Sequence, residues 1–186
     1  KTQRGDVAAL AMSLGTPQTQ FILDDMDADN MIAAPMSWYS GWSYKSSDRG
    51  LVIEFGSAYC ADGMNAVDWA LANYPVEIKT IGIMGYAGDY GGDYAAGVKA
   101  AAEANGLTVA WEYVVPSPEF DVAQAVGLMV TEPVDAYFPA VGPGHMAQVA
   151  GGAFQQGLTP AAMMAAPSYN DAFIAEGFAL APLFQS

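Results

Sequence analysis

Thr80-Ile81-Gly82-Ile83-Met84-Gly85 is a short apolar run that leads into a glycine-rich turn, Tyr86-Ala87-Gly88-Asp89-Tyr90-Gly91-Gly92. An apolar run of this length, bounded by turn residues, is typical of a buried strand. The next stretch, 93–105, is rich in alanine, pairs Lys99 with Glu103 at i,i+4, and ends at Asn105-Gly106, which predicts a helix. The sequence therefore predicts a strand, a turn and a helix, the repeating unit of parallel sheets.

The same unit recurs along the second half of the chain. Apolar runs begin near residues 80, 107, 136 and 161, about 27 residues apart, which is close to the length of a parallel-strand crossover. Between them, apolar residues follow helical spacing over 122–129 and 146–153. This alternation predicts an α/β fold with a mostly parallel sheet and helices on both faces.

The first 56 residues follow a less regular version of this pattern. We expect strands over 7–12, 31–35 and 51–55, a helix over 17–25, and a further helix over 59–73 that leads into the repeating half. The stretch 37–49 combines serine, glycine and aromatic residues and is predicted to be a loop, a setting that often carries recognition. Two strand–helix units are too few to close a sheet, so this portion is expected to be a piece of a larger lobe.

Composition excludes several classes of protein. Of 186 residues 53% are hydrophobic, which supports a sizeable core and excludes disorder as the dominant state. Twenty acidic against six basic residues give a net charge of -14, and residues 100–186 contain no Lys or Arg. Nucleic acid and anionic membrane surfaces are therefore unfavourable partners. No apolar run is long enough to span a membrane and no apolar leader follows the first charges, so we expect neither membrane insertion nor a targeting signal in these residues.

Catalytic and metal-dependent functions find little support. His145 is the only histidine, Cys60 is the only cysteine, and no serine lies in a G-x-S-x-G motif, so neither a catalytic triad nor a Cys/His metal site is expected. Cys60 lies at an expected helix start and is interpreted as an inert small residue. For His145, which follows Gly142-Pro143-Gly144, capping or solvent exposure competes with a functional role. We expect no cofactor and no enzymatic activity.

The turn 85–92 also invites a nucleotide-binding interpretation. Its spacing is G-x-x-G-x-x-G, whereas the dinucleotide motif is G-x-G-x-x-G, and no Gly-Lys-Ser/Thr follows it. Asp89 lies where a pyrophosphate would bind and would repel it. A nucleotide-dependent α/β enzyme is the alternative from another class, and a purely structural role of the glycines is a further one.

Five turns lie at the carboxyl ends of expected strands, the edge at which open α/β sheets bind ligands. They are 13–17, 36–39, 86–90, 142–145 and 168–171. Hydroxyls at helix starts suit a carboxylate or another small anion, whereas carboxylates and tyrosines suit an ammonium group or hydroxyls. A zwitterion would use both kinds of group.

Several segments resemble the periplasmic solute-binding proteins of the Leu/Ile/Val-binding type. They are Val7–Pro17 with its Ser-Leu-Gly-Thr-Pro turn, Met31–Ser37, Thr80–Tyr86 with Asp89-Tyr90-Gly91, and the helix end Gln155–Leu158. The resemblance runs in order over essentially the whole chain. It implies a two-lobed type I periplasmic binding fold, each lobe a parallel sheet flanked by helices, that closes on a ligand.

The resemblance also implies a division of the chain. Residues 1–56 match the later part of lobe one, 57–178 match lobe two, and 179–186 match the start of the crossover back to lobe one. The opening strands of lobe one and its returning half have no counterpart, so the chain is expected to be an internal fragment.

By this likeness Ser13 and Thr16 match the turn that holds the ligand's carboxylate, Ser37 and Trp38 match a second contact loop, and Tyr90 matches a tyrosine that closes over the ligand. Two departures put amino-acid recognition in doubt: Gly142-Pro143-Gly144 where an aromatic residue is usual, and Pro167-Ser168 where a glutamate is usual. An aromatic or aliphatic carboxylate is the alternative ligand. The candidate ligand-binding residues are Ser13, Gly15, Thr16, Ser37, Trp38, Tyr86, Asp89, Tyr90, Gly142, His145, Tyr169 and Asp171.

The expected function is that of the extracytoplasmic ligand-binding component of an ABC importer. Its partners would be a small amino acid or carboxylate-bearing solute and an ABC transporter permease. The resemblance implies a periplasmic or extracellular location, with anchoring at the cell surface. A ligand-sensing domain of a receptor with the same fold is a second binding alternative.

Overall fold

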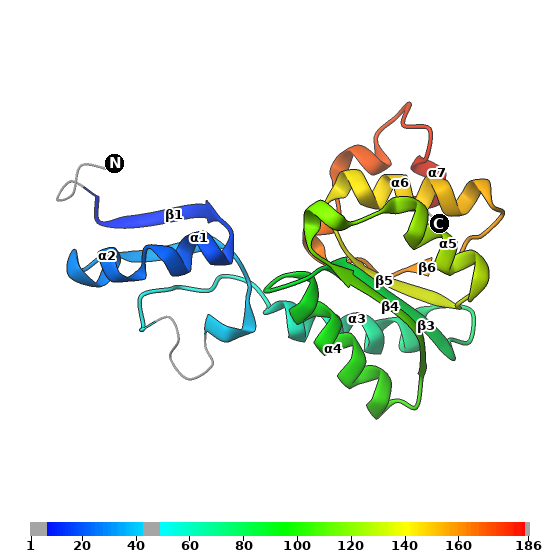
Figure 1. Ribbon diagram of the computed structural model, residues 1–186, viewed down its shortest axis with the longest axis horizontal. Coiled ribbons are helices and arrows are strands. Elements are labelled where there is room, and N and C mark those ends of the chain that lie inside the picture. The colour runs from blue at the N-terminus through cyan, green and yellow to red at the C-terminus, as the bar shows by residue number, and fades with distance from the viewer. Residues whose placement is uncertain (1–6, 43–48, 185–186) are drawn as a thin grey trace.

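The computed structural model describes residues 7–42 and 49–184, which form two α/β units (Figure 1). The first unit, residues 7–42 and 49–56, is built on two parallel strands joined by two short helices. Its elements are β1 (Ala9–Leu14), α1 (Thr16–Phe21), α2 (Leu23–Ala28), β2 (Ile32–Met36) and the 3-10 turn η1 (Ser40–Trp42). Several of its apolar side chains are exposed, among them Leu14 at 74% and Phe21 at 88%, so its sheet is only partly covered.

The second unit, residues 59–184, contains a four-stranded sheet in the order β4-β3-β5-β6, with every neighbouring pair parallel. Helices α3 and α4 cover one face, and α5 and α6 cover the other (Figure 1). Its principal elements are α3 (Tyr59–Asn73), β3 (Thr80–Tyr86), α4 (Gly91–Ala104), β4 (Thr108–Val115), α5 (Val122–Thr131), β5 (Ala136–Ala140), α6 (Pro143–Gln155) and β6 (Ala161–Ala162). The predicted α/β class with a parallel sheet is confirmed, and the helix expected over 59–73 has the predicted bounds.

Some expected elements differ from those observed. The helix expected over 17–25 is divided at Ile22, whose N–H bonds to the carbonyl of Thr19 in a tight turn. The strand expected over 51–55 is a single bridge between Val52 and Ala33. The run from 161 forms only the two-residue β6, after which the chain enters η4 (Ala166–Ser168), which contains a proline.

The end of the second unit is built from two further short helices, η5 (Asp171–Ile174) and α7 (Ala181–Phe184). The rings of Phe184 and Phe173 stack with centroids 4.5 Å apart, so α7 packs on the second unit. The domain boundaries inferred from the resemblance stay predictions. Within the described part of the chain, no helix combines the length and apolar character needed to cross a membrane.

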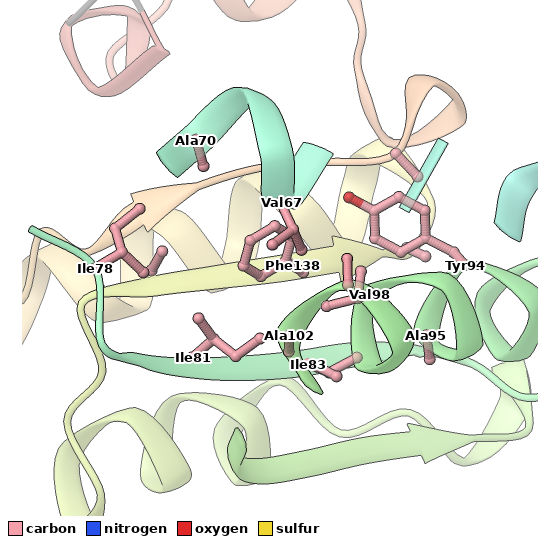
Figure 2. Packing of buried hydrophobic residues seen from close by; sticks show 14 of the residues in the cluster. Val67, Ala70, Ile78, Ile81, Ile83, Tyr94, Ala95, Val98, Ala102 and Phe138 are labelled. Carbon is pink, nitrogen blue, oxygen red and sulfur yellow. The ribbon is translucent and has the colours of Figure 1, made fainter. Parts of the chain in front are cut away.

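Two buried clusters of apolar side chains stabilise the second unit. The central strand β3 is buried along its interior, as a parallel strand covered on both faces should be. Ile81 and Ile83 join the cluster beneath α3 and α4, which also contains Phe138 from β5 (Figure 2). Met84 points to the opposite cluster, beneath α5 and α6. Because its side chains alternate between the two faces of the sheet, β3 contributes to both buried clusters.

Helices α3 and α4 approach each other backbone to backbone. A Cβ atom at Gly97 would lie 1.9 Å from the carbonyl oxygen of Cys60, and one at Gly63 would lie 2.4 Å from that of Tyr94. Both distances are far below van der Waals contact, so these positions require glycine for steric reasons. The contact brings the first turns of the two helices together.

Replacing Gly97 by alanine should therefore destabilise the second unit. We expect the free energy of unfolding, measured by urea denaturation, to fall by about 1–3 kcal/mol because the helices must separate. Gly127 in α5 is the matched control, since a Cβ there would meet no atom within 4 Å. Gly127→Ala should stabilise by up to about 1 kcal/mol through helix propensity. Equal stability of Gly97→Ala and the parent chain would contradict the close helix contact.

Candidate ligand-binding site

The predicted site residues gather at the carboxyl ends of strands in both units. In the first unit Ser13, Gly15 and Thr16 end β1 and begin α1, and Ser37 follows β2. In the second unit the turns after β3 and β5 lie side by side, because these strands are neighbours. The chain runs from β3 to β4 on one side and returns to β5 on the other, so the two turns flank the point where the strand order reverses. Open α/β sheets bind ligands at such points.

The hydroxyls of Thr16 and Ser37 are used inside the first unit. Thr16 is 1% exposed and Ser37 is 2% exposed, and their hydroxyls hydrogen-bond to each other. The indole N–H of the buried Trp42 donates to Ser37 Oγ at 3.0 Å. These two side chains, predicted to contact a ligand, therefore join β2 and η1 to the start of α1.

Ser13 has a different environment. The pairing of β1 with β2 shifts register between Ala11 and Leu14, and Met12 within this bulge has φ of 59°. Left-handed backbone at a non-glycine residue costs about 1–3 kcal/mol and is most common at functional sites. Bulges likewise re-aim side chains beside binding sites. Ser13 Oγ is shielded from solvent and has no hydrogen-bond partner among the described residues, so its hydrogen-bonding capacity is unused in this structure.

Tyr90 has its hydroxyl fixed within the second unit. Its oxygen lies 3.0 Å from Ser168 Oγ and 3.4 Å from the carbonyl oxygen of Val141. Ser168 Oγ in turn accepts from the Val141 N–H at 3.1 Å and donates to the carbonyl of Pro139 at 3.2 Å. Desolvation raises the pKa of Tyr90 well above its ordinary value, so the phenol is neutral. The hydroxyl of Tyr90 thus supports the end of β5, and the predicted contact of its ring with a ligand stays a prediction.

Tyr86 and His145 form a polar pair beside Tyr90. The Tyr86 hydroxyl lies 2.7 Å from His145 Nδ1, and the ring of Phe120 stacks on the imidazole with centroids 5.1 Å apart. A Cβ at Gly142 would lie 3.1 Å from the Tyr86 hydroxyl, so this glycine leaves space for it. The pair joins the turn after β3 to the first turn of α6, and both residues are half-buried.

Asp89, Tyr169 and Asp171 are the remaining predicted residues. Asp89 is half-buried in the turn before α4. Burial is the main cause of the raised pKa of Tyr59, and the Asp89 carboxylate is one of the acids that raise this pKa further. Tyr169 and Asp171 belong to the exposed segment after Ser168, where the Tyr169 ring packs on Phe173. Their role in binding stays a prediction.

Two features were missed by the sequence analysis. The first is a row of aromatic rings that crosses from one unit to the other. Trp38 lies 5.9 Å from Tyr59, Tyr59 lies 4.9 Å from Tyr90, and Tyr90 lies 6.5 Å from Tyr86, centroid to centroid. Tyr59 contacts both Trp38 of the first unit and Tyr90 of the second. It could have been noticed as an aromatic residue at a predicted helix start.

The second missed feature is Asp93, in the first turn of α4. Its carboxylate accepts hydrogen bonds from Ser40 of the first unit and from the backbone N–H of Cys60. Burial and the Asp93 carboxylate raise the pKa of the Cys60 thiol, which accords with an inert cysteine. Asp93 has no sequence signal of its own, because its partners lie 53 and 33 residues away.

The basic side chains within the described ranges are all paired with acids. Arg49 contacts Asp24 at 2.7 Å, Lys79 contacts Glu77 at 2.8 Å, and Lys99 contacts Glu112 at 2.9 Å. Over the same ranges, no three His, Cys, Asp or Glu side chains are arranged to hold a metal ion. Among the described residues, the donors left for an anionic ligand at this site are therefore hydroxyl and backbone N–H groups.

A cavity of about 300 Å³ lies elsewhere, beside β6. Trp69 and Tyr74 at the end of α3, Met163 after β6 and Phe184 of α7 line it, and it contains none of the predicted site residues. The grouping of polar and aromatic side chains at the strand ends, rather than this cavity, marks the candidate site.

The chain is similar in structure to several solved binding proteins. A fatty acid ABC transporter substrate-binding protein from Thermomonospora curvata superposes with a TM-score of 0.83 at 25% identity, over 97% of this chain and 45% of that one. A solute-binding protein of an ABC transporter from Rhodopseudomonas palustris HaA2, in complex with p-hydroxybenzoic acid, gives 0.77 at 13% identity, over 92% and 46%. A branched-chain amino acid ABC transporter protein from Thermus thermophilus with bound valine gives 0.75 at 13%, over 89% and 42%.

The chain thus spans less than half the length of these structures. No curated protein matches the sequence. The sequence profile described as periplasmic binding protein matches residues 2–181, nearly the whole chain. Proteins of this kind bind solutes and are not enzymes. With the parallel sheets and the grouped strand-end residues, this match shows that the chain belongs to the periplasmic binding protein family.

Proposed function

We propose that the chain is part of the solute-binding component of an ABC importer, which captures a carboxylate-bearing solute between its two units. It would act in the periplasm or at the cell surface and deliver the solute to a membrane permease. The observation that carries the proposal is the Ser13 hydroxyl, which is shielded from solvent and unpartnered on the bulge of β1, at the strand ends where such sheets bind ligands. The family and the fold support the same interpretation.

The ligand class follows from the donors and the rings. Fatty acids, p-hydroxybenzoic acid and valine, which appear in the names of the similar proteins, share a carboxylate and differ in the rest of the molecule. In this chain the Ser13 hydroxyl would bind the carboxylate. The aromatic row and the hydrogen-bonded Tyr86–His145 pair would contact the remainder. The row of rings offers apolar contact area to an aromatic or aliphatic body, so we place such carboxylates ahead of amino acids.

Amino acids are the second candidate ligand, favoured by Asp89, whose carboxylate lies near Tyr59 in the turn before α4. An ammonium group is attracted both to a carboxylate and to the faces of tyrosine rings. Binding of an amino acid in preference to the matching desamino acid would show that the ammonium group is recognised.

A thermal-shift screen of the full chain tests the class of ligand. The panel contains aromatic and aliphatic carboxylates, the branched-chain amino acids, NAD and ATP. A bound carboxylate at 100 times its dissociation constant should stabilise the protein by about 2.7 kcal/mol, whereas the nucleotides should not move the melting temperature. Saturable stabilisation by NAD or ATP, with no response to carboxylates, would overturn the transport function.

Substituting Ser13 separates a ligand contact from a structural one. Ser13→Ala should weaken the tightest carboxylate of the screen about tenfold or more, because a hydrogen bond to a charged group is lost, and should leave the unliganded protein at least as stable as the parent. Thr16→Val is the matched control, since it removes the partner of the Ser37 hydroxyl and should lower stability instead. Calorimetric titration and melting of both variants measure the two effects. Unchanged affinity in Ser13→Ala would place the carboxylate elsewhere.

A further inference from the structure

We infer that Asp93 is a positioning residue that holds the loop of residues 37–42, here called the interlobe loop, against the second unit. Asp93 Oδ2 accepts from the Ser40 N–H at 3.0 Å and from the Cys60 N–H at 3.3 Å, and Oδ1 accepts from the Ser40 hydroxyl at 2.5 Å. The donors come from two segments, one in each unit. A single carboxylate therefore joins the first unit to the starts of both α3 and α4.

The start of α3 explains why the carboxylate is needed there. The first N–H groups of a helix have no partner within the helix, and a serine, threonine or aspartate side chain commonly binds one of them. The residue at this position is Ala58, which has no capping side chain. The Tyr59 N–H donates instead to the carbonyl of Trp38 at 2.7 Å, and the Cys60 N–H donates to Asp93. The helix start is thus completed by the interlobe loop and by α4.

The interlobe loop is fixed to the first unit through other side chains. Ser37 bonds to Thr16, and Trp42 donates to Ser37, whereas Trp38 and Ser40 contact the second unit. The loop is thus bonded to the rest of the first unit through Ser37, its end at Trp42 bonds back to Ser37, and its middle contacts the second unit. Its contacts with Asp93 are charge-assisted and are correspondingly strong. Removing them should free the second unit to move relative to the first.

This inference rests on the proposed function only for its consequence for ligand affinity. A ligand held between two units binds tightly only when the distance between the units fits it. The contacts of Asp93 with the interlobe loop are tested without ligand. Spin labels are placed at two exposed positions, by Gln20→Cys in α1 and Glu103→Cys in α4, in a Cys60→Ser background of the full chain. Pulsed electron paramagnetic resonance then reports the distribution of distances between the units.

We expect the parent to give one dominant distance. Ser40→Ala and Asp93→Asn should each populate other, mostly longer distances. The ratio of the parent distance to these other distances should fall about tenfold, which is the effect of losing a hydrogen bond to a charged group. Asp68→Asn is the matched control. Its carboxylate contacts Asn105 at 3.3 Å within the second unit, so the distribution should not change.

Circular dichroism establishes that each variant is folded. If Asp93→Asn does not fold, Ser40→Ala decides, because it keeps both the Asp93 carboxylate and the backbone contact of residue 40. Parent-like distance distributions in the folded variants would overturn the inference. That result would leave the ligand screen unaffected, whereas a failed screen would leave the distance measurement unaffected.

Discussion

The close contact between α3 and α4 is the constraint on which the rest of the second unit depends. Gly63 and Gly97 let the two backbones approach to distances at which no side chain fits. Because the helices cross so closely, the first turn of α4 lies beside that of α3, and Asp93 reaches the Cys60 N–H. The same approach aligns Tyr59 with Tyr90, so the aromatic row also follows from it. A steric requirement in the helix interiors thereby determines the geometry at the strand ends.

The hydroxyls at the site fall into two groups according to whether the protein already satisfies them. Those of Thr16, Ser37 and Tyr90 bond within the fold and stabilise the segments that surround the site. That of Ser13 is shielded from solvent without a partner among the described residues, a state that costs free energy unless a ligand supplies the bond. Under the proposed function, the satisfied hydroxyls hold the surroundings of the site in place and the Ser13 hydroxyl contributes to ligand affinity.

The sequence predicted what depends on local patterns. The helix over 59–73 and the buried β3 follow from apolar spacing, and the grouping of turns follows from the rule that parallel strands share a carboxyl edge. The residue-by-residue roles were harder to predict, because the hydrogen bonds of Thr16 and Asp93 join segments 21 and 53 residues apart. The strand expected over 51–55 was wrong since β propensity does not supply a partner, and Val52 has only one bridge.

The internal bonding of Tyr90 has a consequence for the evolution of specificity. Its hydroxyl, together with Ser168, holds the end of β5, so a change at either position would disturb the sheet. Tyr86 and His145 share a hydrogen bond with each other, and a compensated double change there would leave the strands intact. Under the proposed function, relatives that bind other solutes should therefore differ at 86 and 145 together, while 90 and 168 are kept for folding.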